Sequence, residues 1–124
     1  MIPDMYVRAL RGATTIEQNL RKDIMFETKN LLSKLVETNE ISHDDIVSII
    51  FSTTRDINAA FPAAAAREMG WNDIPLMCTN EMEVVGSLQK CIRVLMHINC
   101  CKTNSQLKHV YLKEAKKLRP DLTL

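Results

Sequence analysis

The stretch CIRVLMHI, residues 91–98, constrains the fold most, because one arginine interrupts an otherwise apolar run. Read with the two-residue period of a β-strand, it has two distinct faces. One face is entirely apolar and consists of Ile92, Val94, Met96 and Ile98. The other face carries Cys91, Arg93, Leu95 and His97. We expect the first face to pack in the core and the second to carry any chemistry.

Arg93 needs an anionic or polar partner in this strand. Its guanidinium stays charged, and burying an unpaired ion is too costly to persist. A carboxylate, a cluster of carbonyls, water or an anionic ligand would satisfy it. Glu81 lies twelve residues earlier and would form a structural ion pair across a turn near Gly86 and Ser87. From this segment alone, the ion pair and a ligand site are both open.

The size and charge of the chain limit its function. With 124 residues it is expected to form a single domain, residues 1–124, large enough for a core. Its 46% hydrophobic and 25% charged residues are typical of a soluble globular protein. The formal net charge of +1 gives no electrostatic footprint for nucleic acid, so neither nucleic acid nor membrane is an expected partner.

No apolar run reaches the roughly eighteen residues of a membrane span, and the first residues, MIPDMYVR, lack the layout of a signal peptide. A cytoplasmic location is therefore expected. The four cysteines contain no CxxC pair and are interpreted as free thiols. The three histidines, His43, His97 and His109, are scattered, so no metal is expected.

The first half of the chain predicts a strand followed by a long helix. Met5 to Arg11 is rich in strand formers and is expected to end in a turn at Gly12. The capping-box pattern Thr14-x-x-Glu17 then predicts the start of a helix that reaches about Thr38 or Asn39. Its apolar stripe is formed by Leu20, Ile24, Thr28, Leu31, Leu32 and Leu35.

The middle of the chain predicts two strands around a short helix. Ile46 to Thr53 leaves little polar surface and is expected to be a central strand, after a possible cap at Ser42-x-x-Asp45. A short helix begins at Pro62 and ends at Gly70. Ile74 to Thr79 predicts a further strand, in which Pro75 favours an edge position.

The end of the chain is ambiguous. Lys102 to Ser105 predicts a turn, and we favour a strand at Val110 to Leu112, although KEAKKL favours a helix and Val110 to Leu118 stays open. The order of elements predicts an α+β (α/β-like) fold, a mixed sheet of about five strands with one long and one short helix on one face. Oligomerisation would cover the other face.

Several arginines in or beside apolar elements indicate an anion site. They are Arg8, Arg11, Arg67, Arg93 and Arg119, accompanied by Tyr111, Glu81 and Cys78. Arginine forks bind carboxylates, a tyrosine adds a hydroxyl donor, and a glutamate accepts from an alcohol. The set suits a dianion that bears a hydroxyl, and it contains no evident nucleophile.

Six ordered motifs carry a family resemblance. They are RGATT at 11–15, FPAAAARE at 61–68, CTNEM at 78–82, CIRV at 91–94, HVYL at 109–112 and LRPDL at 118–122. In this order and spacing the chain resembles the trimeric, pseudo-α/β-barrel (AroH) class of monofunctional chorismate mutase, from about Val7 to Leu124. The resemblance implies a cofactor-free [3,3] sigmatropic (Claisen) rearrangement of chorismate to prephenate, on the route to phenylalanine and tyrosine.

The resemblance also implies roles for individual residues. Arg93 would donate to the ether oxygen as negative charge grows there, with a contribution of roughly 3 to 4 kcal/mol. Arg11 and Tyr111 would bind the enolpyruvyl carboxylate, and Glu81 with Cys78 the ring hydroxyl. The substrate-binding wall would comprise Phe61, Ala63, Leu76, Met77 and Leu118, with Arg67 and Arg119 near the mouth. Arg8 is interpreted as structural.

The chain departs from the family pattern at two positions. Ala64 stands where a lysine is common and Met77 where a threonine is common, so we expect a raised KM before a lowered kcat. A tail that ends soon after LRPDL is expected to close the site less fully. The resemblance implies a homotrimer with a site at each subunit interface. The alternative is a non-catalytic trimer that binds a small carboxylated metabolite.

Overall fold

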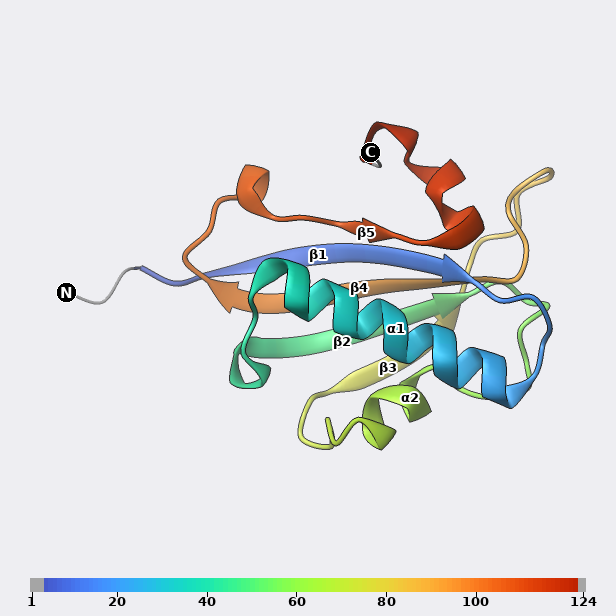
Figure 1. The fold of residues 1–124 in the computed structure, drawn as a ribbon, viewed down its shortest axis with the longest axis horizontal. Helices are drawn as coiled ribbons and strands as arrows, with labels where there is room; N and C mark the ends of the chain where they lie inside the picture. The colour runs from blue at the N-terminus through green and yellow to red at the C-terminus, as the bar shows by residue number, and fades with distance from the viewer. Residues whose placement is uncertain (1–3, 123–124) are drawn as a thin grey trace.

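The computed structural model describes residues 4–122, which form a five-stranded mixed sheet with both helices on one face (Figure 1). The strand order is β3-β2-β4-β1-β5. The strands are β1 (Tyr6–Thr15), β2 (Ile46–Thr53), β3 (Leu76–Asn80), β4 (Cys91–Cys100) and β5 (Val110–Tyr111). The helices are α1 (Arg21–Asn39) and α2 (Ala63–Glu68), with short 3-10 turns η1 (His43–Asp45), η2 (Asn104–Gln106), η3 (Lys113–Leu118) and η4 (Pro120–Leu122). The predicted fold class is confirmed.

Strand pairing makes the sheet mixed. The middle strand, β4, pairs antiparallel with both β1 and β2, whereas the outer strands β3 and β5 pair parallel with β2 and β1. The bounds predicted for β2 are confirmed, and β2 is an interior strand paired on both sides, although β4 occupies the middle of the sheet. β3 is the edge strand that Pro75 predicted; it begins at Leu76 and not at Ile74.

The expected turn at Gly12 was wrong, because β1 continues to Thr15. β4 is long enough to pair with the whole of β1, from Tyr6 opposite Cys100 to Thr15 opposite Cys91. Gly12 is needed there for a close approach of the helix: a Cβ would lie 3.0 Å from Leu35 Cδ1. The glycine therefore serves helix packing and not chain reversal.

We expect Gly12→Ala to lower the free energy of unfolding by about 1–3 kcal/mol, because overpacking forces neighbours to shift. The new methyl would meet Leu35 Cδ1 at 3.0 Å, Leu31 Cδ1 at 3.1 Å and the Val110 carbonyl at 3.3 Å. Chemical denaturation measures the loss. In a Leu35→Val background, which removes the nearest methyl, the same change should cost less. Equal losses in both backgrounds would contradict this account.

The start of α1 also differs from the prediction. Thr14 lies in β1, and the helix begins at Arg21 after an extended Leu20 that makes no side-chain cap. Leu20 is consequently 41% exposed and does not belong to the apolar stripe. The rest of the stripe is buried, and the predicted end at Asn39 is confirmed. Ser42 precedes a 3-10 turn but forms no side-chain cap.

The two-faced character predicted for β4 is confirmed. The apolar face is almost fully buried beneath α1 and α2: Ile92 0%, Val94 3%, Met96 0% and Ile98 1% exposed. α2 begins directly after Pro62 and ends at Glu68, two residues before the predicted end at Gly70, whose φ is +87°. At the chain end, β5 stops at Tyr111, so the predicted strand residue Leu112 was wrong; KEAKKL is the 3-10 helix η3.

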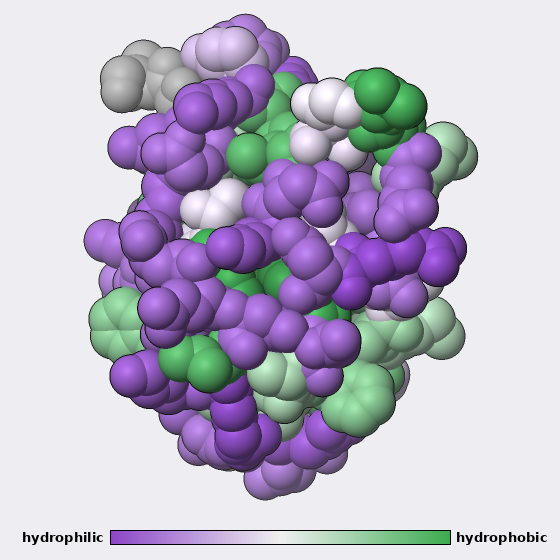
Figure 2. Space-filling model, turned by 90° about the vertical axis from the view of Figure 1, so that its right-hand side faces the viewer, coloured by the Kyte–Doolittle hydropathy of each residue, from purple (hydrophilic) through white to green (hydrophobic). Residues whose placement is uncertain are grey.

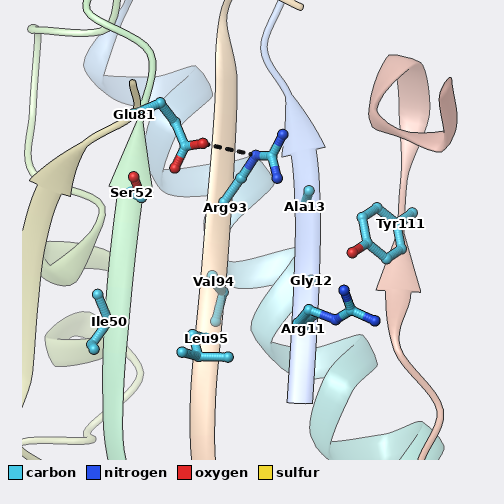
Figure 3. Close-up of a pocket in the computed structure, with 10 residues that line it drawn as sticks. All are labelled: Arg11, Gly12, Ala13, Ile50, Ser52, Glu81, Arg93, Val94, Leu95 and Tyr111. Atoms are coloured by element: carbon cyan, nitrogen blue, oxygen red, sulfur yellow. Dashed lines mark ion pairs between the residues drawn. The ribbon is translucent and has the colours of Figure 1, made fainter. Parts of the chain in front are cut away.

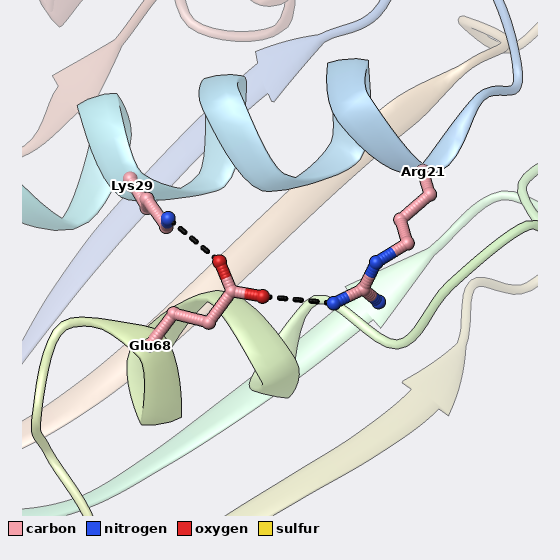
Figure 4. A network of polar contacts seen from close by, with 3 residues as sticks. All are labelled: Arg21, Lys29 and Glu68. Carbon is pink, nitrogen blue, oxygen red and sulfur yellow. Dashed lines mark hydrogen bonds and ion pairs between the residues drawn. The ribbon is translucent and has the colours of Figure 1, made fainter.

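An exposed ion network joins the two helices (Figure 4). The Glu68 carboxylate of α2 accepts from Lys29 Nζ and Arg21 Nη2, both at 2.8 Å. The hydrogen bond from Lys29, with the nearby positive charges, lowers the pKa of Glu68. Since the folded pKa is lowered, this contribution to stability is present at neutral pH and is lost as pH falls through the acidic range. The network helps position α2 on α1.

Within residues 4–122, no helix is long and apolar enough to cross a membrane. The same residues contain no group of three or more His, Cys, Asp or Glu side chains placed to hold a metal ion.

Candidate functional site

The sheet face opposite the helices carries the charged side chains. Along β1 and β4, alternate residues such as Leu10 and Val94 are buried beneath the helices. Arg11 and Arg93 occupy the intervening positions and therefore point to the open face. Two arginines far apart in sequence thus lie on the same face of neighbouring strands.

A cavity of about 260 Å³ lies on this face (Figure 3). Its lining comes from four strands and the segment after β3, and comprises Arg11, Gly12, Ala13, Ile50, Ser52, Glu81, Arg93, Val94, Leu95 and Tyr111. The walls are largely apolar, and the charged groups are two arginines and one glutamate. All three residues expected to be catalytic, together with Tyr111, are thus brought together.

Arg93 and Glu81 form the ion pair that the sequence allowed. Arg93 Nε lies 3.1 Å from Glu81 Oε1, and the side chains are 43% and 26% exposed. The contact lacks hydrogen-bond geometry, however, so the buried Nε–H has no hydrogen-bond partner among the described residues. Such a donor costs free energy unless something accepts from it. Nε faces Glu81, but the Arg93 side chain is partly exposed and lines the cavity, so the rest of the guanidinium can serve an acceptor placed there.

Arg11 and Tyr111 add polar groups that are not engaged. Within residues 4–122, the Arg11 guanidinium makes no ion pair or hydrogen bond, and the Tyr111 hydroxyl makes no hydrogen bond. In Figure 3 the Tyr111 hydroxyl points from β5 toward β1, on the side where the Arg11 guanidinium lies. Two guanidiniums against one carboxylate leave the cavity with an excess of positive charge. Such a site favours a ligand with carboxylates.

A second cavity, of about 300 Å³, gathers most of the other expected residues. It is lined by Phe61, Ala63, Arg67, Leu76 and Cys78, beside α2 and the edge strand β3. Desolvation raises the pKa of Cys78, an effect that a hydrogen bond with the Ala63 backbone and the nearby Arg67 charge partly offset, so its thiol is a neutral hydrogen-bonding group. In one chain Cys78 and Glu81, expected to share a hydroxyl, line different cavities.

The remaining expected residues line neither cavity. Met77 is 62% exposed, and Leu118 packs against the cluster around Tyr111 and Ala115. Arg119 donates from Nε and Nη2 to the Asp121 carboxylate at 3.0 and 2.8 Å. Ala64, the departure from the family pattern noted above, lines a third cavity of about 610 Å³ that also includes Phe61 and Cys78.

Sequence reasoning missed several residues of the first cavity, most notably Ser52. Ser52 lies opposite Arg93 in the register of β2 and β4, and it lines the cavity together with Ile50. The alternation of Ser48, Ile50 and Ser52 on one face of the strand was the signal that pointed to it. A near-continuous apolar run concealed this alternation.

The segment between β3 and β4 borders the cavity at one end of the molecule. Figure 2 shows this end, where the surface is mostly hydrophilic; some hydrophobic residues lie recessed between polar ones and others protrude. The segment itself exposes Met82, Val84 and Val85. Cys91, which opens β4 beneath it, is 2% exposed, and burial raises its thiol pKa to about 11. It is an unreactive core residue.

Comparisons with known proteins agree on one family. The sequence model described as chorismate mutase type I matches residues 7–122. The chain is 45% identical over 121 residues to chorismate mutase AroH of Bacillus subtilis, covering 97% of this chain and 95% of that one. It is 44% identical to chorismate mutase AroH of Thermus thermophilus, covering 94% and 96%. A solved chorismate mutase from Clostridium thermocellum is similar with a TM-score of 0.87 and 54% identity, over 89% of this chain and 98% of that one.

Proposed function

This chain belongs to the chorismate mutase type I family, and we propose from that premise how its residues catalyse the rearrangement of chorismate to prephenate. The chain is a chorismate mutase, an isomerase of aromatic amino acid biosynthesis. One observation carries the mechanism: two arginines on neighbouring strands, Arg11 and Arg93, line a single cavity with only one carboxylate, Glu81, beside them. The reaction is an intramolecular [3,3] shift, so the protein contributes positioning and electrostatics.

Binding is proposed to begin at the β5 side of the first cavity. The free Arg11 guanidinium and the Tyr111 hydroxyl would hold the enolpyruvyl carboxylate through charge-assisted hydrogen bonds. Glu81 would accept a hydrogen bond from the ring hydroxyl. These contacts would hold chorismate in the compact, chair-like conformation in which the reacting carbons approach each other.

Arg93 is proposed to act on the transition state. The ether C–O bond breaks ahead of C–C bond formation, so negative charge grows on the ether oxygen. An Arg93 donor fixed in the cavity would stabilise that charge more strongly than the ground state. The place of Arg93 in the cavity lining and its 43% exposed side chain support this role, because they leave part of the guanidinium accessible to a ligand. Glu81 would keep the guanidinium oriented from the other side.

Assembly is proposed to complete the site. The helices cover one sheet face only, and the residues expected to bind substrate are divided between two cavities. In a homotrimer, the cavity with Phe61, Arg67 and Cys78 of one subunit would adjoin the cavity with Arg93 of its neighbour, giving three sites at subunit interfaces. Leu76 and Met77 would belong to the same wall, and Leu118 and Arg119 to the mouth.

Light scattering is expected to give a mass of about three times 14.1 kDa. Dilution that dissociates the trimer should abolish turnover, because each site would lose residues of the partner. A stable monomer with full activity would contradict the proposed assembly.

The loss of chorismate absorbance after addition of the protein tests the proposed reaction directly. Turnover to prephenate supports it. Saturable chorismate binding without turnover would instead support a non-catalytic trimer that binds a carboxylated metabolite.

A cytoplasmic, single-domain enzyme is also proposed, and its four free cysteines are consistent with a reducing compartment.

A further inference from the structure

His109 contacts the backbone of Arg11 in a position that the strand pairing leaves empty. β5 is only two residues long, so its parallel ladder with β1 covers Gly12 and Ala13 alone. The Ala13 carbonyl accepts from Leu112 N, which places the backbone groups of Ala13 on the β5 side. Backbone groups two residues apart in a strand point the same way, so the Arg11 N–H also points toward β5, beyond the end of the ladder.

The imidazole of His109 takes the place of the missing ladder acceptor. The Arg11 N–H donates to His109 Nδ1 at 3.0 Å. Without it, this backbone donor would have no protein partner on that side. The bond requires Nδ1 to be unprotonated, which means a neutral ring with its proton on Nε2.

We infer that His109 is a positioning residue for Arg11: its neutral ring fixes the backbone of β1 at the point from which the Arg11 side chain enters the cavity. The inference rests on the proposed function only in so far as Arg11 binds a substrate carboxylate. It adds a residue that makes no contact with the cavity, since His109 is absent from its lining.

Burial and the positive charges around His109 both favour its neutral ring. Partial burial is the largest cause of its lowered pKa, and the positive charges of Arg11 on β1 and Arg119 after η3 add to it. The Arg119 charge is itself balanced by Asp121 on η4. Because the folded pKa is lowered, protonation costs stability as pH falls below about 6.5, and the loss is complete below the folded pKa. Protonation would also turn the Nδ1 acceptor into a donor that faces the Arg11 N–H.

Two variants test the inference. His109→Ala removes the acceptor, whereas His109→Asn keeps an oxygen near the position of Nδ1 and cannot titrate in this range. For chorismate, His109→Ala should raise KM by up to about 100-fold, the cost of a small misplacement of a binding group, with kcat changing less. His109→Asn should keep KM near the wild-type value. The wild-type KM should rise as pH falls through the lowered pKa of His109 in the folded protein, and that of His109→Asn should not.

Amide hydrogen exchange of Arg11 and ¹⁵N NMR of the His109 ring test it independently of catalysis. The Arg11 amide should be protected in the wild type and in His109→Asn, and should exchange faster in His109→Ala. In the wild type, ¹⁵N NMR should show His109 in the Nε2–H form. Unchanged protection and KM in His109→Ala, or a protonated Nδ1 in the wild type at neutral pH, would overturn the inference. If His109→Ala does not fold, His109→Asn alone decides. A folded His109→Asn whose Arg11 amide is protected but whose KM is raised would also overturn the inference. A wild type without turnover would refute the proposed function, and the exchange data would still decide whether His109 holds Arg11.

Discussion

Arg93→Ala is expected to lower kcat by about 100- to 1,000-fold, or roughly 3–4 kcal/mol, while KM changes much less. The lost donor would act on charge that develops on the ether oxygen only in the transition state, so ground-state binding has little to lose. Stopped or continuous assays of chorismate absorbance measure both constants. Arg93→Lys should also be impaired, because an ammonium does not reproduce the planar fork of a guanidinium.

A structural role for Arg93 makes a different prediction. The pair with Glu81 is partly exposed and poorly aligned, so its loss should change the free energy of unfolding by about 1 kcal/mol or less. A large loss of stability with an almost unchanged kcat would show that the arginine serves only the fold. Arg55→Ala is the matched control, because Arg55 makes an exposed 3.7 Å pair with Glu83 and lines none of the described cavities. Its kinetics should match the wild type.

Arg11→Ala is expected to lower kcat/KM by about 2–5 kcal/mol, or roughly 30-fold to several thousandfold, chiefly by raising KM. Among the described residues the guanidinium makes no ion pair or hydrogen bond, although its charge helps lower the pKa of Asp121, so it is available to the substrate carboxylate. Removing it would leave that carboxylate without its main counter-charge. Initial rates over a wide range of chorismate concentrations give both constants, and the loss should shrink as salt screens the interaction in the wild type.

Arg8→Ala is the control on the same strand. Arg8 donates from Nε to the Lys102 carbonyl at 3.0 Å and lies over the Tyr6 ring, outside the first cavity. Its removal is expected to affect stability and not kcat/KM. If both arginine variants raised KM equally, the effect would be one of general charge and the assigned role of Arg11 would be wrong.

Local periodicity correctly predicted features that depend only on residues close together in the sequence. The alternation in β4 identified its buried face and the face of Arg93, and the apolar run of β2 predicted its bounds. The stripe on α1 likewise predicted its end at Asn39. A side chain's face follows from a fixed number of residues per turn or per pleat, so these features need no distant contact.

Features that depend on distant contacts were mispredicted. A turn was predicted at Gly12 because glycine commonly ends strands. Instead, β4 pairs along all of β1, and the missing side chain of Gly12 leaves room for Leu35 of α1. The capping pattern at Thr14 was overridden by the same pairing. Ser52 and the short β5 depend on strand order, which local sequence does not encode.

The motif around Arg93 was sufficient to show that a charged donor must meet an anionic or polar partner, since a guanidinium cannot be neutralised in an apolar strand. The ordered motifs also identified the family that the comparisons show. Tertiary structure alone decided which groups surround that donor. Pairing of β4 with β1 and β2, of β5 with β1 and of β3 with β2 brings Arg11, Tyr111 and Glu81 into one cavity with Arg93, whereas Phe61 and Cys78 line another. The physical reason is that local rules orient a side chain, whereas strand order and register determine its neighbours.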